Sequence, residues 1–259
     1  KSNMNPFQKT SKQLSIFVTA GYPTLESTVE QILFLQQSGV DFIELGIPFS
    51  DPMADGPIIQ ESSAIALQNG MTLELLFEQI ESIKNEIQIP IVLMSYLNPI
   101  LKFGLERFID RAKKCNIKGI IIPDLSFEIV QSHYSELFNS TSLPLIYLIT
   151  PETEASRISN IVESSVNSFI YLVSSNSITG EGNKLAQNKL KYGEIKKLSK
   201  DVPVMLGFGI KTANDVELAQ EVLNGAIIGS EYIRQLSEGK QEEFIQSLLR
   251  HDDITLGIP

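Results

Sequence analysis

Two carboxylates, Glu44 and Asp55, stand eleven residues apart on either side of a proline-rich loop and could carry acid/base chemistry. Glu44 interrupts an apolar, strand-like run over residues 40–45, and Asp55 lies in the loop that follows. A carboxylate at a buried strand end costs on the order of several kcal/mol unless it is paired, hydrogen-bonded or protonated. Acid/base catalysis uses groups whose surroundings push their pKa values apart, and these two fit that description. The plainer alternatives are a satisfied structural carboxylate at Glu44 and a simple turn at Asp55.

Glycines that could approach an anion closely occur late in the chain, as Gly207-Phe208-Gly209 and as Gly229-Ser230. Each group follows an apolar run, and Gly229-Ser230 begins a helical pattern. Backbone N–H groups and a helix amino terminus both attract phosphate, so we expect a phosphate site here. A tight turn is the alternative for the GxG sequence, and Ser230 could simply cap the helix.

Short apolar runs alternate with amphipathic stretches along the whole chain. Continuous hydrophobic runs are typical of strands buried on both faces of a parallel sheet, and parallel strands need helical crossovers. Eight such units predict an α/β fold, a (β/α)8 barrel with extra helices, as one domain over residues 1–259 with short extensions at 1–5 and 251–259. The predicted strands are 14–19, 41–45, 91–94, 119–122, 143–148, 168–173, 202–206 and 225–228, and the clearest helices are 25–38, 73–87, 216–223 and 231–249.

Two predicted loops, residues 48–56 and 174–190, are longer than usual and leave the carboxyl ends of strands. That end of a barrel carries active sites. The second loop contains Gly180 and Gly182 and suits a mobile lid, although an ordinary surface loop would have a similar composition.

The composition narrows the class of protein. The net charge is -10, which repels nucleic acid and anionic lipid surfaces. The apolar runs are far shorter than the roughly 20 residues that cross a bilayer, and no signal pattern opens the chain. With Cys115 as the single cysteine there is no internal disulfide. We therefore expect a cytoplasmic protein with neither a membrane nor a nucleic-acid partner.

Two kinds of carbon–carbon bond chemistry are disfavoured. The only histidines, His133 and His251, fall in a helical segment and in the tail, so a histidine metal site is not expected. No lysine ends a predicted strand: Lys118 precedes one and Lys211 lies beyond the glycine loop. A Schiff-base mechanism therefore lacks its nucleophile.

The sequence Glu44-Leu-Gly-Ile-Pro-Phe-Ser-Asp-Pro-Met-Ala-Asp-Gly-Pro57 closely resembles the tryptophan synthase alpha subunit family. The resemblance begins at Phe17-Val-Thr-Ala-Gly-Tyr-Pro23 and continues in order through nearly the whole chain. Its further motifs are Tyr96-Leu-Asn-Pro99, Ile122-Pro-Asp124, Tyr171-Leu-Val-Ser174, Thr179-Gly180 and the two glycine groups.

The resemblance implies retro-aldol cleavage of indole-3-glycerol phosphate to indole and glyceraldehyde 3-phosphate, without a cofactor in this chain. Glu44 matches the general acid/base that protonates indole C3, and Asp55 matches the aspartate that engages the indole N–H. The other matching positions imply substrate contacts at the indole (Phe17, Ile59, Tyr96, Pro123), the glycerol (Tyr171), the lid (Thr179) and the phosphate (Gly180, Phe208, Gly209, Gly229, Ser230). For Phe17, Ile59 and Tyr96 the alternative is plain barrel core.

The resemblance also implies a partner, a pyridoxal-phosphate beta subunit that joins indole to serine in an alpha-beta-beta-alpha heterotetramer. Pro48, Asp51 and Pro52 match the contact loop for that subunit. Two lid positions depart from the family pattern, Ser175 and Ser177, where a basic residue and a glycine are usual.

Two other functions stay open. A phosphosugar isomerase or epimerase barrel would share the glycine loops but would need a different arrangement of acid and base. A protein that acts mainly as an allosteric activator of its partner would show little cleavage of its own.

Overall fold

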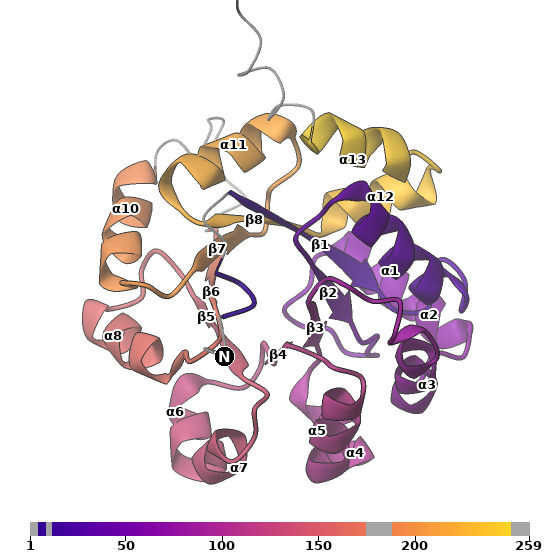
Figure 1. Ribbon diagram of the computed structural model, residues 1–259, viewed down its shortest axis with the longest axis horizontal. Helices are drawn as coiled ribbons and strands as arrows, with labels where there is room; N and C mark the ends of the chain where they lie inside the picture. The colour runs from indigo at the N-terminus through magenta and orange to yellow at the C-terminus, as the bar shows by residue number, and fades with distance from the viewer. Residues whose placement is uncertain (1–4, 9–11, 175–187, 250–259) are drawn as a thin grey trace, which may run out of the picture.

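The computed structural model describes residues 5–8, 12–174 and 188–249, and its centre is a closed barrel of eight parallel strands (Figure 1). Each strand pairs with its neighbours in chain order, and β8 closes the barrel on β1. The predicted barrel is therefore confirmed. The strands are β1 (Gln13–Thr19), β2 (Phe42–Gly46), β3 (Ile91–Met94), β4 (Gly119–Ile121), β5 (Leu145–Ile149), β6 (Ile170–Val173), β7 (Val204–Gly207) and β8 (Gly225–Ile228).

Helices surround the barrel, as Figure 1 shows, and most of them lie between successive strands. Those before β5 are α1 (Ser27–Ser38), α2 (Pro57–Gln68), α3 (Leu73–Ile83), α4 (Leu97–Phe103), α5 (Leu105–Lys114), α6 (Phe127–Ile129), a π-helix η1 (Val130–Tyr134) and α7 (Ser135–Asn139). Those after it are α8 (Ala155–Ser164), α10 (Lys189–Leu198), α11 (Ala213–Val222), α12 (Ser230–Ser237) and α13 (Gln241–Leu249).

Local chemistry fixes several helix ends. The Thr72 hydroxyl accepts a hydrogen bond from the Leu75 N–H at 3.2 Å and caps α3. A capping box starts α11: the Asp215 N–H donates to the Thr212 hydroxyl, and the Thr212 N–H donates to the Asp215 carboxylate. Each cap satisfies backbone donors that a helix leaves free at its start.

The predicted helix over residues 231–249 is wrong as a single element. The structure divides it into α12 and α13, because Gly239 adopts φ 70°, a left-handed conformation that ends a helix. The helix predicted over 73–87 ends at Ile83 instead. Helix α2 follows Gly56 and has Pro57 at its first position, where proline is favourable.

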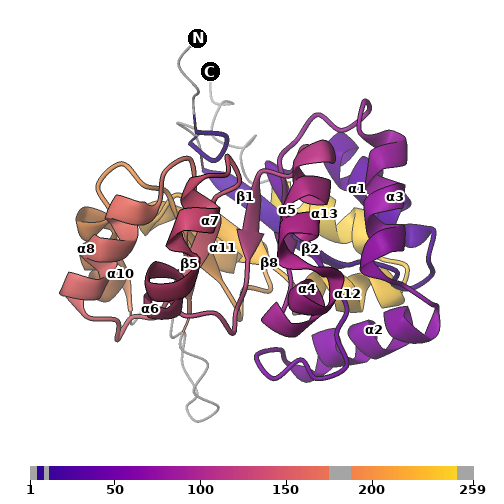
Figure 2. The same ribbon diagram turned by 90° about the horizontal axis from the view of Figure 1, so that it is seen from below.

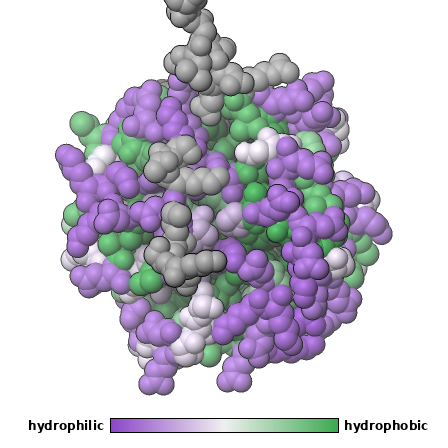
Figure 3. Space-filling view, viewed as in Figure 1, coloured by the Kyte–Doolittle hydropathy of each residue, from purple (hydrophilic) through white to green (hydrophobic). Residues whose placement is uncertain are grey.

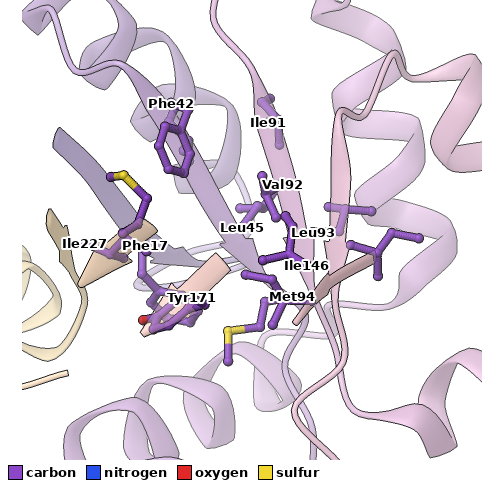
Figure 4. Close-up of a cluster of buried hydrophobic side chains, with 14 of the residues drawn as sticks. Phe17, Phe42, Leu45, Ile91, Val92, Leu93, Met94, Ile146, Tyr171 and Ile227 are labelled. Carbon is purple, nitrogen blue, oxygen red and sulfur yellow. The ribbon is translucent and has the colours of Figure 1, made fainter. Parts of the chain in front are cut away.

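Aromatic rings close the amino end of the barrel. Phe7 lies with its ring centroid 5.3 Å from that of Phe42 and 5.0 Å from that of Phe169. Asn5 holds this segment in place, because its side-chain amide donates to the Ser168 carbonyl at 2.8 Å. Apolar side chains from the strands fill the interior next to these rings (Figure 4), so the opposite, carboxyl end is left for a site.

Helix α2 lies crosswise to α3 and α5 at the outer edge of the molecule, on the side away from the N-terminus (Figure 2). It follows the proline-rich loop after β2 and packs against β1 and α12. The face in Figure 3 is largely hydrophilic, in keeping with the net charge. No helix in the described ranges is long and apolar enough to span a membrane.

Candidate active site

Glu44 lies in the interior of the barrel on β2, level with Phe17 of β1 and Val92 of β3. Its side chain is 1% exposed, and neither carboxyl oxygen has a hydrogen-bond partner among the described residues. Burial without a partner disfavours the charged form and raises the pKa of Glu44 to about 8. At neutral pH this carboxyl is therefore mainly protonated and can donate its proton.

Asp55 lies in the loop after β2, and its carboxylate is hydrogen-bonded to Tyr96, which follows β3. The Tyr96 hydroxyl donates to Asp55 Oδ2 at 2.9 Å and accepts a hydrogen bond from the Ala54 N–H at 2.9 Å. Burial raises the pKa of Asp55, while the Tyr96 hydrogen bond opposes that rise. Asp55 therefore has a partner that favours its charged form, whereas Glu44 has none.

A single small cavity brings several predicted residues together. Phe17, Asp55, Ile59 and Tyr96, for which the family resemblance implies contacts with the indole, all line it. The remaining lining residues are Gly46, Ile47, Ser63, Met94 and Ser95. The lining combines one carboxylate, two aromatic rings and aliphatic side chains. The cavity measures only about 10 Å³, so its walls must move apart to admit a ring the size of indole.

Five of the lining residues were not predicted as site residues, and two of these, Ser63 and Ser95, have polar side chains. Ser63 stands four residues after Ile59 on α2, so both side chains lie on one face of that helix. That spacing could have revealed Ser63, but the weak apolar pattern over residues 57–68 concealed the helix itself. Ser95 follows β3 directly and donates to the Tyr96 carbonyl at 3.0 Å.

Tyr171 on β6 lies within electrostatic range of both carboxylates. Burial raises the pKa of Tyr171, and the charges of Glu44 and Asp55 raise it further. The phenol therefore stays neutral and can donate a hydrogen bond. Phe17, Met94 and Tyr171 belong to one cluster of buried side chains (Figure 4).

The glycine loop after β7 has two distinct functions. Phe208 and Gly209 adopt φ 65° and 74°, so the backbone turns sharply there. The Ser174 hydroxyl donates to the Phe208 carbonyl and the Ser174 N–H donates to the Gly207 carbonyl at 3.0 Å, which joins this turn to the end of β6. Gly207 serves packing instead, because a Cβ there would lie 2.1 Å from the Tyr171 hydroxyl.

The start of α12 adjoins the same cavity. A Cβ on Gly229 would lie 3.5 Å from Ile59 and 3.6 Å from Phe17. The expected cap at Ser230 is wrong: Gly229 is the N-cap residue, Ser230 is the first helical residue, and no side chain caps this end. The Ser230 hydroxyl therefore does not cap α12, and no side chain caps the first N–H groups of this helix.

Pro123 stands apart from the other predicted indole contacts. It is half-buried and lines a second cavity beyond β4 and β5, together with Asp124, Tyr147 and Arg157. The structure does not bring Pro123 into the cavity that contains Asp55.

The described part of the chain, residues 5–8, 12–174 and 188–249, contains no group of three His, Cys, Asp or Glu side chains that could bind a metal ion. His133 lies in η1, where its ring contacts Ser132.

The family model for the tryptophan synthase alpha chain matches residues 4–253. The chain belongs to the tryptophan synthase alpha chain family.

Curated relatives support this membership. The tryptophan synthase alpha chain of Christiangramia forsetii is 46% identical over 232 residues, which cover 89% of this chain and 90% of that one. The corresponding chain of Flavobacterium psychrophilum is 47% identical over 232 residues, covering 89% and 91%.

Solved structures agree in fold. The tryptophan synthase alpha chain from Legionella pneumophila superposes with a TM-score of 0.85 at 31% identity and covers 95% of this chain and 94% of that chain. An aminoacrylate-bound tryptophan synthase from M. tuberculosis gives a TM-score of 0.80 at 27% identity, with 92% of each chain covered.

Some of the residues that the family resemblance marks are not described. Thr179, Gly180, Ser175 and Ser177 lie in residues 175–187, outside the described ranges. In the expected contact loop, Pro48 is buried, Pro52 is half-buried and Asp51 is exposed. Met53, next to Pro52, is 90% exposed, which is unusual for a large apolar side chain.

Proposed function

We propose that this tryptophan synthase alpha chain uses Glu44 and Asp55 to cleave indole-3-glycerol phosphate into indole and glyceraldehyde 3-phosphate. The observation that carries the proposal is the unpartnered Glu44 carboxyl, whose pKa of about 8 makes it an acid at neutral pH. A carboxyl group with an ordinary pKa would be charged at neutral pH and would have no proton to give to a carbon atom.

In the proposed reaction the Glu44 carboxyl transfers its proton to C3 of the indole ring, and positive charge develops at the ring nitrogen. The charged Glu44 then accepts the proton of the glycerol hydroxyl next to the bond that breaks. The carbonyl of glyceraldehyde 3-phosphate forms as the carbon–carbon bond breaks, and its electron pair returns to the ring as indole. Glu44 recovers its proton, so the cycle balances without a metal or an imine.

Asp55 is proposed to stabilise the charge at the ring nitrogen. Tyr96 donates to Oδ2, and no other described side chain forms a hydrogen bond with this carboxylate, so Oδ1 can accept the indole N–H. A fixed negative charge aimed at a developing positive charge lowers the barrier without reorganising at the moment of reaction.

The substrate orientation follows from the same residues. Phe17, Ile59 and Tyr96 would contact the indole, and Tyr171 the glycerol. Backbone groups around Gly209 and the start of α12 would bind the phosphate, with Ser230 adding its hydroxyl. Thr179 and Gly180 remain proposed substrate contacts within residues 175–187.

The partner is proposed to be a pyridoxal-phosphate beta subunit that receives the indole in an alpha-beta-beta-alpha heterotetramer. Pro48, Asp51 and Pro52 would contact it, and the cofactor would belong to the beta subunit alone. We place the assembly in the cytoplasm, as one domain per alpha chain over residues 1–259.

Product analysis tests this function. The chain with its beta partner, given indole-3-glycerol phosphate, should release glyceraldehyde 3-phosphate and form tryptophan from serine. Asp55→Asn should reduce cleavage by roughly 10²–10³-fold, as loss of an electrostatic stabiliser does elsewhere. Asp201→Asn, at an exposed position outside the site, should leave it unchanged. Isomerised phosphosugar without indole would contradict the proposal.

A further inference from the structure

The Tyr96 hydroxyl makes two contacts with the loop after β2. It accepts the Ala54 N–H at 2.9 Å and donates to Asp55 Oδ2 at 2.9 Å. One atom therefore binds the backbone just before Asp55 and the Asp55 carboxylate itself. This arrangement fixes both the position and the direction of the carboxylate.

Tyr96 is itself held on a rigid part of the barrel. It is the N-cap residue of α4, two residues after the end of β3, and its side chain is buried. Its ring packs against Phe49 with centroids 5.3 Å apart. The next residue, Leu97, donates its N–H to Asp124 Oδ1 at 2.9 Å, which ties the start of α4 to the segment after β4.

The other hydrogen bonds that the described residues make with the Asp55 loop come from the loop itself and from the start of α2. The Asp55 N–H donates to the Pro52 carbonyl at 3.1 Å, and the Gln60 side chain donates to the Asp55 carbonyl at 2.8 Å. Among the described residues, Tyr96 makes the only hydrogen bonds that join residues 50–56 to another strand end of the barrel. Among the described residues, no other side chain forms a hydrogen bond with the Asp55 carboxylate.

We propose that Tyr96 is a positioning residue for Asp55, whose hydroxyl aims the carboxylate into the cavity so that one oxygen faces the reacting ring. The proposal rests on the proposed function, because it gives Asp55 its task at the ring nitrogen. It adds a role that the ring of Tyr96, as a wall of the pocket, does not perform.

The pH dependence of the reaction should reveal this role. A hydroxyl that donates to a carboxylate stabilises its charged form and so lowers its pKa. The other ionisable groups near this pair are Glu44 on β2, Tyr171 on β6 and Asp124 after β4. Without the hydroxyl, burial alone acts on Asp55, and its pKa should rise. The acid limb of kcat/KM should then move to higher pH.

Tyr96→Phe tests the proposal because it removes the hydroxyl and keeps the ring. The alpha chain with its beta partner is assayed for cleavage across the pH range. We expect kcat to fall about 10–100-fold, as misplacing a reacting group does. We expect the acid limb to move to higher pH, with KM changing less than kcat. The matched control is Tyr192→Phe, a buried tyrosine on α10 that is not part of the site, which should leave kcat and the pH profile unchanged.

A double-mutant comparison separates this proposal from the proposed function. If Asp55→Asn abolishes cleavage, adding Tyr96→Phe should cost little more, because the hydroxyl acts through Asp55. Cleavage that survives Asp55→Asn would overturn the role of Asp55 itself. An impaired Asp55→Asn together with a Tyr96→Phe whose kcat and acid limb match the parent would overturn only the positioning role.

A direct titration guards against loss of folding as the cause. The carboxyl carbon of Asp55, labelled with carbon-13, is followed by NMR in the parent and in Tyr96→Phe. The titration midpoint should move to higher pH in the variant while the thermal midpoint stays close to that of Tyr192→Phe. Unchanged titration of Asp55 would overturn the proposal whatever the activity.

Discussion

Gly207 on β7 lies so close to Tyr171 on β6 that a Cβ at residue 207 would be 2.1 Å from the tyrosine hydroxyl. The ring carbons of Tyr171 would be 2.4 Å away, so no small shift of the hydroxyl relieves the contact. The absence of a side chain at residue 207 therefore determines where the Tyr171 phenol can lie beside the two carboxylates.

Gly207→Ala should force Tyr171 out of position. We expect a loss of stability of about 1–3 kcal/mol from overpacking and a fall in kcat/KM of roughly tenfold or more. Gly193→Ala is the matched control. Gly193 lies within helix α10, and a Cβ there would make only an ordinary contact, 3.9 Å from Val222. That substitution should stabilise the chain by about 0.5–1 kcal/mol and leave cleavage unchanged. Equal behaviour of the two variants in thermal unfolding and in kinetics would contradict the packing argument.

The cleavage rate should fall at alkaline pH. Glu44 must be protonated to transfer its proton, and its pKa is about 8. As far as Glu44 ionisation determines it, the rate of the chemical step should be constant below about pH 7. Well above pH 8 it should decrease tenfold per pH unit. Single-turnover measurements on the complex would show it. A chemical step that is still accelerating at pH 9 would be inconsistent with Glu44 as the acid.

Stability should also depend on the Glu44 carboxyl. Its pKa in the folded chain is raised to about 8 from 4.5, so the folded state binds the proton more tightly than the unfolded state. The stabilisation is fully present below pH 4.5 and is lost as the pH rises to about 8. Glu44→Gln, which cannot ionise, should be more stable than the parent at pH 8 by about 1–4 kcal/mol and similar to it at pH 5. Denaturant unfolding at the two pH values checks the difference, and a variant that is equally destabilised at both would count against it.

Ser230→Ala should affect binding and leave folding unchanged. The serine does not cap α12, so the free energy of unfolding should change by less than about 0.5 kcal/mol. A hydroxyl that contacts phosphate contributes about 1.5–3 kcal/mol, so KM should rise about 10–100-fold. Thr212→Ala provides the opposite case, because Thr212 does cap α11 and lies outside the proposed site; it should lose about 1 kcal/mol of stability with little change in KM. A Ser230→Ala chain with a lowered free energy of unfolding and an unchanged KM would show that Ser230 stabilises the fold and does not bind phosphate.

Asp51→Asn should weaken the partner contact. Asp51 is exposed, and its carboxylate accepts a hydrogen bond from the Ser50 hydroxyl at 2.6 Å. A charge at the rim of an interface chiefly affects association, so the concentration of beta subunit that gives half-maximal activation should rise severalfold. Cleavage by the isolated chain should not change. Glu78→Gln, at an exposed position on α3, is the control. An unaltered activation curve for Asp51→Asn would remove this residue from the proposed interface.

The parts of the site that could be predicted are those with a local signature. Glu44 is conspicuous because a carboxylate within a continuous apolar run is costly. In the structure it is buried, with no hydrogen-bond partner among the described residues. The barrel was predictable because its strands are apolar on both faces and alternate with helices. Phe17, Ile59 and Tyr96 were predicted from the family resemblance alone, and in the structure they line the cavity that contains Asp55.

Other parts depend on three-dimensional contacts that no sequence pattern contains. The hydrogen bond of Tyr96 with Asp55 spans 41 residues and requires two strand ends to meet. The close approach of Gly207 to Tyr171 likewise arises only when β6 and β7 pair. Helix α2 escaped prediction because its buried face includes Ser62 and Ser63, which weaken the apolar period of 3.6.

Cleavage of indole-3-glycerol phosphate by Glu44→Gln in complex with the beta subunit would show whether Glu44 is the acid. Glutamine keeps the size of the side chain and removes its proton, so cleavage should fall by about 10²–10⁴-fold or more. Assembly, and tryptophan formation from added indole and serine, should be retained, and Glu78→Gln should match the parent. If Glu44→Gln cleaves the substrate at the parental rate, Glu44 is not the acid and the proposed mechanism is wrong.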